Sequence, residues 1–171
     1  MDEKGTGVTA IDQRTFRKAM GCFATGVTIV TSTDPEGKPV GLTVSAFTSL
    51  SLEPPLVLVC LDKKTACLSA FRSAGHFAVH VLRDNQRDLS GRFAIRGGDK
   101  WQGIAYERRT TGAPILPGCL AVADCRIEEV LEGGDHVIII GRVEGLDFSE
   151  AGGPLLYFRG AYGEMGCSNI P

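Results

Sequence analysis

The sequence lacks the short motifs that mark the most common nucleotide-binding and hydrolytic enzymes. No G-x-G-x-x-G follows a β-rich run, no Walker sequence is present, and neither H-E-x-x-H nor G-x-S-x-G occurs in the 171 residues. These absences argue against the usual dinucleotide-binding fold, P-loop enzymes, zinc proteases and α/β-hydrolases. A nucleotide site in this chain therefore has to be built in another way.

Metal-binding and reactive-thiol patterns are also missing. The six cysteines form no C-x-x-C pair, and no histidine lies near them at zinc-ligand spacing. A disulfide framework is not expected in a reducing cytosol. No cysteine lies in an activating sequence, so we expect small apolar packing residues rather than a thiol nucleophile. We predict no metal site.

The chain has no stretch suited to nucleic acid or to a membrane. The formal net charge is −2, and Lys and Arg are interspersed with Asp and Glu, so no basic stripe is available for a phosphate backbone. The longest apolar run, residues 54–61, is far too short to cross a bilayer. The polar start MDEKGTGVTA does not have the layout of a signal peptide. We expect a cytoplasmic protein with neither kind of partner.

What the sequence does contain is a series of β-branched runs separated by turn residues. With 43% hydrophobic residues, the chain is long enough for one buried core, so a single domain over residues 1–171 is expected, folded over about 10–164. Roughly seven strands, three short helices and no strand–helix alternation favour a mainly β protein, a closed or half-closed antiparallel β-barrel. The expected strands are residues 27–31, 40–47, 56–61 (buried on both faces), 77–82, 119–131, 136–146 and 155–162. Three short helices are expected: one capped by Asp12, one from Thr65 to Phe71, and one that starts at Asp84 or Asn85. Residues 96–117 are expected to form a surface loop.

The first candidate site is the run from Gly41 to Pro55. Thr43 and Ser45 fall on one face of a strand, and the small residues around them would let a flat ligand approach the backbone. A solvated Ser/Thr face on an edge strand explains the same pattern without a ligand.

The second candidate is Cys60-Leu61-Asp62-Lys63-Lys64-Thr65-Ala66-Cys67, a strand end followed by the expected start of a helix. Free amides and the positive end of the helix dipole suit a phosphate. A capping Thr65 with solvated lysines is the alternative interpretation.

The third candidate is Gly133-Gly134-Asp135-His136 together with the segment from Leu155 to Gly163. His136 stands where a turn becomes a β-branched strand, and Arg159 is expected on a neighbouring strand. Together they would hold a second anionic ligand on which a tyrosine stacks. His136 as a packed strand residue, and Tyr157 and Tyr162 as core aromatics, remain the structural alternative.

In this order and spacing, the segments resemble the short-chain flavin reductase family, the reductase components of two-component flavin-dependent monooxygenases. The resemblance is carried by T-G-V-T-I-V-T (25–31), S-A-F-T-S-L-S-L-E-P-P (45–55), G-D-H (134–136) and P-L-L-Y-F-R-G (154–160). It implies an FMN-binding split barrel, a Greek-key antiparallel barrel that transfers hydride from NADH or NADPH to FAD or FMN. It also implies a homodimer with flavin near the subunit interface, and a partner monooxygenase that receives reduced flavin.

The resemblance also assigns residues. His136 corresponds to the histidine at the pyridine-nucleotide site, where it would donate to the nicotinamide amide or to a phosphate, and Arg159 would offset phosphate charge. Position 67 is often serine or threonine in the family, and a cysteine is a poorer hydrogen-bond donor, so the role of Cys67 stays open. The resemblance places the contacts with the flavin ring at Gly41, Thr43, Ser45 and Ala46. It places the contacts on the phosphate side at Cys60, Leu61, Asp62, Thr65 and Cys67, with Arg92 and Phe93 nearby. The pyridine nucleotide would lie along Tyr157, Phe158, Arg159 and Gly160.

Two other functions fit the same fold. A flavin- or haem-carrying split barrel without catalysis would use the barrel as a holder, but it has no need of a second anionic-ligand site at His136 and Arg159. A split-barrel oxidase acting on a pyridoxal-type phosphate would be expected to have more Arg and Lys around a compact phosphate.

Overall fold

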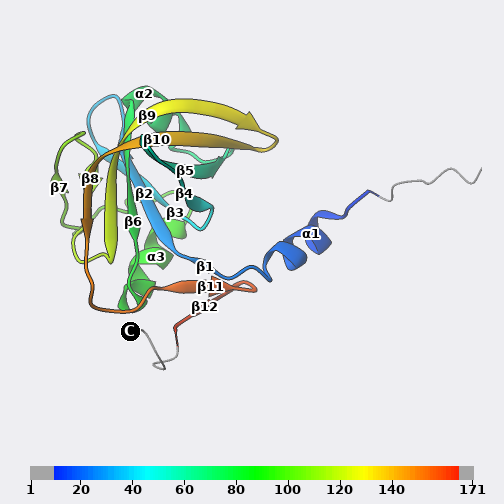
Figure 1. Cartoon of the computed structure of the whole chain (residues 1–171). Helices are drawn as coiled ribbons and strands as arrows, with labels where there is room; N and C mark the ends of the chain where they lie inside the picture. The colour runs from blue at the N-terminus through cyan, green and yellow to red at the C-terminus, as the bar shows by residue number, and fades with distance from the viewer. Residues whose placement is uncertain (1–9, 166–171) are drawn as a thin grey trace, which may run out of the picture.

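A computed structural model describes residues 10–165, in which one antiparallel sheet dominates (Figure 1). Its seven strands lie in the order β3-β2-β6-β9-β10-β5-β4. The strands are β2 (Thr28–Thr33), β3 (Pro39–Val44), β4 (Phe47–Leu52), β5 (Pro55–Asp62), β6 (His76–Val81), β9 (Ala121–Gly133) and β10 (His136–Phe148).

The sheet curls into a half-closed barrel because its two edge strands are neighbours in sequence. β3 and β4 are joined only by Ser45 and Ala46, so the first and last strands of the sheet have to meet at this corner. Cys60 N donates to Ala46 O (3.0 Å), which ties the corner to β5. The expected continuous strand over 40–47 is therefore wrong: it breaks at 45–46 and turns a corner. The mainly β architecture is confirmed.

Short helices and hairpins surround the barrel. α2 (Leu68–Ala74) and α3 (Arg87–Ala94, after the 3₁₀ turn η1 at Asp84–Gln86) cover it, whereas α1 (Gln13–Met20) extends away from the barrel (Figure 1). β11 (Leu156–Phe158) pairs with β1 (Thr25–Gly26) and β12 (Ala161–Gly163) in a separate sheet. β7 (Glu107–Arg108) and β8 (Pro114–Ile115) form a small hairpin. No helix among residues 10–165 is long and apolar enough to cross a membrane.

Several local predictions hold, and their causes lie in neighbouring residues. Asp12 caps α1, accepting from Thr15 N at 2.9 Å. β10 begins at His136, after a turn in which Gly134 has φ +66°.

Other predictions fail where distant segments decide the structure. β5 is not buried on both faces: Val57, Val59 and Leu61 point into the core, but Leu58 and Cys60 are only half-buried. Thr65 does not cap α2, since the helix starts at Leu68 and its N-cap, Cys67, makes no side-chain capping bond.

The predictions for the loop over 96–117 and the strand over 155–162 also need correction. Within the expected surface loop, Ala113, Ile115 and Leu116 are buried, and Leu116 N donates to His80 Nε2 at 3.0 Å. Part of that loop therefore closes one side of the core. The expected strand over 155–162 is instead the hairpin β11–β12, because Arg159 and Gly160 both have positive φ, at +49° and +84°.

Candidate functional site

A cavity of about 760 Å³ opens beside the β3–β4 corner and collects most of the predicted flavin residues. Its walls are the edge of β3, the end of β5, the loop into α2, and the loop that follows α3. The predicted residues that line it are Gly41, Thr43, Ser45, Ala46, Cys60, Leu61, Asp62, Thr65, Cys67, Phe93 and His136.

The β3 wall presents backbone rather than hydroxyl groups. Thr43 Oγ1 donates to Ser90 O at 2.6 Å, so this hydroxyl binds α3 and is not free for a ligand. A Cβ on Gly41 would lie 2.9 Å from Phe93 Cε1, so a side chain there would push against α3. Gly41 O, in contrast, accepts from Lys100 Nζ, which also lines the cavity. Since β3 is an edge strand, its unpaired backbone groups are available on this side.

The loop after β5 is shaped by Asp62. Its carbonyl accepts from Thr65 N at 2.9 Å and its carboxylate from Lys64 N at 2.8 Å, which folds residues 62–65 into a turn. Burial raises the pKa of the Cys60 and Cys67 thiols. Both thiols therefore stay protonated at neutral pH and offer no thiolate nucleophile, as expected from the sequence.

His136 is one of the residues that line the cavity; it is half-buried and is the first residue of β10. It lies opposite Asp62 on β5 in the strand register. Its Nδ1 is 2.7 Å from Asp135 Oδ1, and this bond lowers the pKa of the Asp135 carboxyl. Lys63 Nζ donates to Gly134 O at 2.7 Å, so the β5–α2 loop holds the turn that carries the imidazole. The ring is fixed through Nδ1, which leaves Nε2 for a ligand.

The remaining predicted residues lie elsewhere in this chain. Arg92 donates to the carbonyl of Gln102, outside the cavity lining. The segment from Tyr157 to Gly160 belongs to the β11–β12 hairpin, which pairs with β1, whereas β10 pairs with β9 and β5. The prediction that His136 and Arg159 of the same chain lie on neighbouring strands is therefore wrong.

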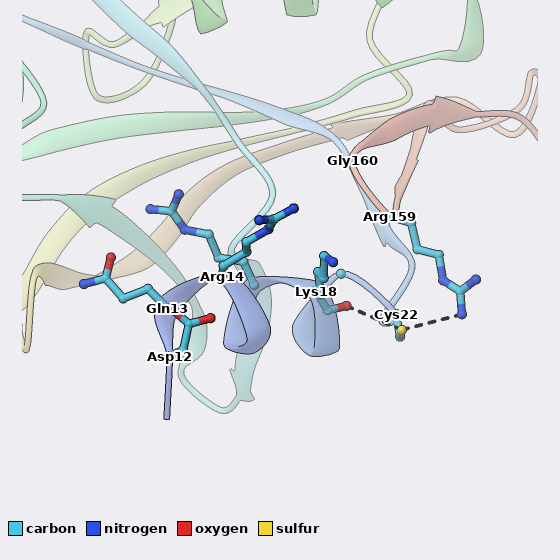
Figure 2. A pocket seen from close by; sticks show the side chains of 9 residues that line it. Asp12, Gln13, Arg14, Lys18, Cys22, Arg159 and Gly160 are labelled. Carbon is cyan, nitrogen blue, oxygen red and sulfur yellow. Dashed lines mark hydrogen bonds between the residues drawn. The ribbon is translucent and has the colours of Figure 1, made fainter. Parts of the chain in front are cut away.

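Arg159 lines a second hollow of about 800 Å³ between α1 and the hairpin turn (Figure 2). Its backbone N–H donates to Gly21 O at 2.8 Å, and its guanidinium points toward the thiol of Cys22 (Nη2–Sγ 3.7 Å). The other basic side chains around this hollow, Arg14, Arg17 and Lys18, come from α1.

Sequence reasoning missed several charged residues of the cavity, among them Asp34, Arg96 and Lys100. Lys100 Nζ donates to Phe93 O at 2.9 Å and more weakly to Gly41 O at 3.3 Å. Burial lowers its pKa, and the nearby Cys67 thiol acts in the opposite direction. The run Asp99-Lys100-Trp101 was the available signal, but its Gly-rich surroundings favoured a surface loop.

Comparison with known proteins places the chain in a family. Residues 20–166 match the model of the flavin reductase like domain. The reductase subunit HsaB of a flavin-dependent monooxygenase from Rhodococcus jostii is 46% identical over 153 residues, which cover 90% of this chain and 78% of that protein. A probable flavin reductase of Rhizobium meliloti is 45% identical over 88% of this chain, but the chain spans only 48% of its length.

A solved structure agrees with these matches. The Streptomyces globisporus NADH:FAD oxidoreductase SgcE6, in complex with NAD and FAD fragments, superposes with a TM-score of 0.87 at 32% identity, covering 93% of this chain and 96% of that one. The shared fold is the half-closed antiparallel barrel described above. The chain belongs to the flavin reductase like domain family.

Proposed function

We propose that the protein is an NAD(P)H-dependent flavin reductase that transfers hydride from NADH or NADPH to FAD or FMN and supplies reduced flavin to a separate monooxygenase. The observation that carries this proposal is the cavity at the β3–β4 corner. It combines a small-residue wall, the cation Lys100, which has no carboxylate partner among residues 10–165, and the imidazole of His136, which is held by Asp135.

The donor set of the cavity fits a flavin. The small residues Ser45 and Ala46 leave room for a flat ring against the backbone, and the free edge of β3 offers amide groups for its polar rim. Cationic Lys64 and Lys100 line the phosphate side together with the turn at 62–67. A bound flavin supplies the hydride-accepting chemistry, so the chain itself has only to bind, orient and shield.

The proposed roles follow from position. The segment from Gly41 to Ala46 contacts the ring, while Cys60, Leu61, Asp62, Thr65 and Cys67 line the phosphate side. His136 orients the nicotinamide donor through Nε2, because its Nδ1 is committed to Asp135. Arg92 remains a predicted neighbour of the phosphate side, although it is not one of the residues that line the cavity.

The rival function is a flavin or haem holder without catalysis. Among the described residues that line the cavity, His136 is the one histidine, and its Nδ1 is bound to Asp135; the thiols of Cys60 and Cys67 are kept protonated because burial raises their pKa. An imidazole that lines the cavity and is held at Nδ1 by Asp135 favours a second substrate over simple storage.

The test is spectroscopic and uses the purified full chain. FAD or FMN is mixed with NADH or NADPH, and the absorbance of the nicotinamide band is followed. We expect oxidation of at least one nucleotide with at least one flavin. If flavin binds but no combination oxidises either nucleotide, the holder is correct and the reductase is not.

Replacing His136 by alanine is expected to raise KM for the nicotinamide donor about tenfold, because a charge-assisted or neutral hydrogen bond to the donor is lost. The flavin dissociation constant should change little, since the proposed contact of His136 is with the nicotinamide donor. Glu150→Ala, at an exposed position in the loop after β10 that lines neither cavity, is the matched control. Unchanged KM and kcat in His136→Ala would remove His136 from the site.

The proposal includes a homodimer. The outer face of β5 and β10 leaves Leu58, Cys60, Ile138 and Ile140 half-buried, and this face adjoins the cavity at Cys60 and His136. α1 has no buried residue, although Phe16 and Met20 are apolar. A second copy would cover these surfaces and would explain why Tyr157 to Gly160 lie away from the site of their own chain.

Sedimentation velocity tests the assembly. We expect a species of twice the chain mass at micromolar concentration, and Ile138→Asp is expected to shift it toward the monomer because a charge would be buried in the interface. A wild-type protein that sediments as a monomer at all concentrations would contradict the dimer.

We further propose one flavin reductase domain over residues 1–171 and a cytoplasmic location.

A further inference from the structure

The turn that leads into His136 is bound by the residue directly after β5. Lys63 N donates to Asp135 O at 3.0 Å, and Lys63 Nζ donates to Gly134 O at 2.7 Å. Gly134 and Asp135 are the two residues that precede His136. The Asp135 carboxylate in turn lies 2.7 Å from His136 Nδ1. Lys63 therefore binds both carbonyl groups of the turn that ends at the imidazole.

A carboxylate from the end of β9 fixes the Lys63 ammonium. Glu132 Oε2 lies 2.6 Å from Lys63 Nζ, and Glu132 Oε1 accepts from Arg72 Nη2 of α2 at 2.8 Å. The bonds from Lys63 and Arg72 lower the pKa of the Glu132 carboxyl, so it is ionised at neutral pH. An isolated exposed ion pair holds two long side chains poorly, whereas here one carboxylate binds two cations, and one of these also binds the turn. We call Lys63, Arg72 and Glu132 the turn clamp.

The backbone of the turn has little packing to hold it. Gly133 and Gly134 have more conformational freedom than other residues would, and Gly134 has φ +66°. A Cβ on Gly134 would meet no described residue beyond its chain neighbours within 4 Å. Both Gly134 and Asp135 are exposed. The position of Asp135, and with it the direction of the His136 ring, therefore depends on hydrogen bonds such as those from Lys63.

We propose that the turn clamp positions His136 for the nicotinamide donor, with Lys63 and Glu132 as positioning residues. This inference rests on the proposed function. Neither Lys63 nor Glu132 is among the residues that line the cavity, so both act through the backbone of the turn and not on a ligand. A hydrogen bond weakens steeply when its distance and angle change, so a loose turn would bind and align the donor less well.

The experiment is a double-mutant cycle between Lys63→Met and His136→Ala in the full chain. KM and kcat are measured at saturating flavin for the nicotinamide nucleotide that the wild type oxidises. Alone, Lys63→Met should raise KM about threefold to fivefold and leave the flavin dissociation constant within about twofold. In the His136→Ala background it should change KM by less than about 1.5-fold, because no imidazole is left to position. Lys63→Arg should bring KM back close to the wild-type value, since a guanidinium also donates to the turn and to Glu132.

A second measurement does not depend on activity. Backbone amide relaxation by NMR on the ligand-free protein should give lower order parameters for residues 134–136 in Lys63→Met than in the wild type. Arg126→Met is the matched control, because it breaks the exposed ion pair with Glu144 on the same β9–β10 hairpin and should change neither KM nor these order parameters. Glu132→Gln, which removes the counter-charge but keeps the size of the side chain, should act in the same direction as Lys63→Met and takes its place if that variant does not fold.

The alternative outcomes are distinct. An equal rise of KM in the wild-type and His136→Ala backgrounds would mean that Lys63 acts on the donor without His136, and would overturn the proposal. An unchanged KM in Lys63→Met would overturn it too, and so would a matching loss of flavin affinity, which would indicate a general structural role. A wild type that binds flavin but oxidises no nicotinamide nucleotide refutes the reductase function. The order parameters then decide whether Lys63 fixes His136, and unchanged values in Lys63→Met would show that it does not.

Discussion

Replacing Gly141 by alanine is expected to destabilise the fold by roughly 3 kcal/mol, at the upper end for inserting a methyl group into a filled core. A Cβ at this position would lie 2.4 Å from Cε1 and Cζ of Phe77 and 3.0 Å from Cβ of Cys125. Phe77 is fully buried, so its ring cannot move aside into solvent. Urea unfolding at one fixed protein concentration measures the change in the free energy of unfolding.

Two further variants separate crowding from a general effect of losing glycine. A Cβ on Gly91, within α3, meets nothing within 4 Å, so Gly91→Ala should be neutral or stabilise by about 0.5–1 kcal/mol through helix propensity. Adding Phe77→Leu to Gly141→Ala should cost less than the sum of the two single changes, because the smaller side chain makes room. If Gly141→Ala is as stable as the wild type, the Phe77 ring can move aside for the added methyl group, and the prediction is wrong.

Acid is expected to destabilise the protein through His80, by about 3 kcal/mol on going from neutral pH to pH 4. Complete burial lowers the pKa of His80 from 6.5 to about 4, and Arg109 adds to this effect, while the bond to Ile29 O opposes it. Leu116 N donates to Nε2 and Nδ1 lies 3.0 Å from Ile29 O, so the folded ring is neutral with its proton on Nδ1.

The sign follows from the two states of the chain. Between pH 6.5 and about 4 the unfolded histidine takes up a proton and the folded one does not, so stability is present above this window and is lost as pH falls through it. His80→Gln keeps a polar side chain that does not titrate. Its stability at pH 7.5 should be reduced, because one bond is lost, but its loss between pH 7.5 and pH 5 should be about 2 kcal/mol smaller than that of the wild type.

This comparison also isolates His80 from other titrating groups. His76, half-buried beside Thr33, has a pKa lowered by burial and contributes in the same direction. Its contribution is present in both proteins and cancels in the difference. Parallel stability curves for wild type and His80→Gln would mean that His80 is not the buried neutral group described here.

Much of the local structure was predictable because its causes are local. The β-branched run after Thr25, the Asp12 cap and the turn before His136 depend on residues a few positions apart. The same holds for the small-residue wall from Gly41 to Ala46, which the structure places along one cavity. What these residues bind is still a prediction.

The failures share a different cause. The residue pattern around Ser45 is typical of a strand. The chain nevertheless turns a corner at Ser45 and Ala46, because the closure of the barrel brings β3 and β4 together there. In the sequence, residues 113–116 belong to a stretch with the composition of a polar loop. In the structure they lie in the core, where Thr31 Oγ1 donates to Pro114 O at 2.6 Å and Leu116 N donates to His80 Nε2 at 3.0 Å.

The strand content, the turns, the capped helix and the residue types around the site could thus be predicted from the amino-acid order, because hydrophobic periodicity, backbone freedom and side-chain chemistry act over short distances. Two features depend on long-range contacts: Lys100 enters the cavity because it bonds to Phe93 O of α3 and Gly41 O of β3, and Arg159 lies away from His136 because of which distant strands pair. β10 pairs with β5 rather than with β11 because its buried face, Val137 and Ile139, completes the apolar core with Val59 and Leu61.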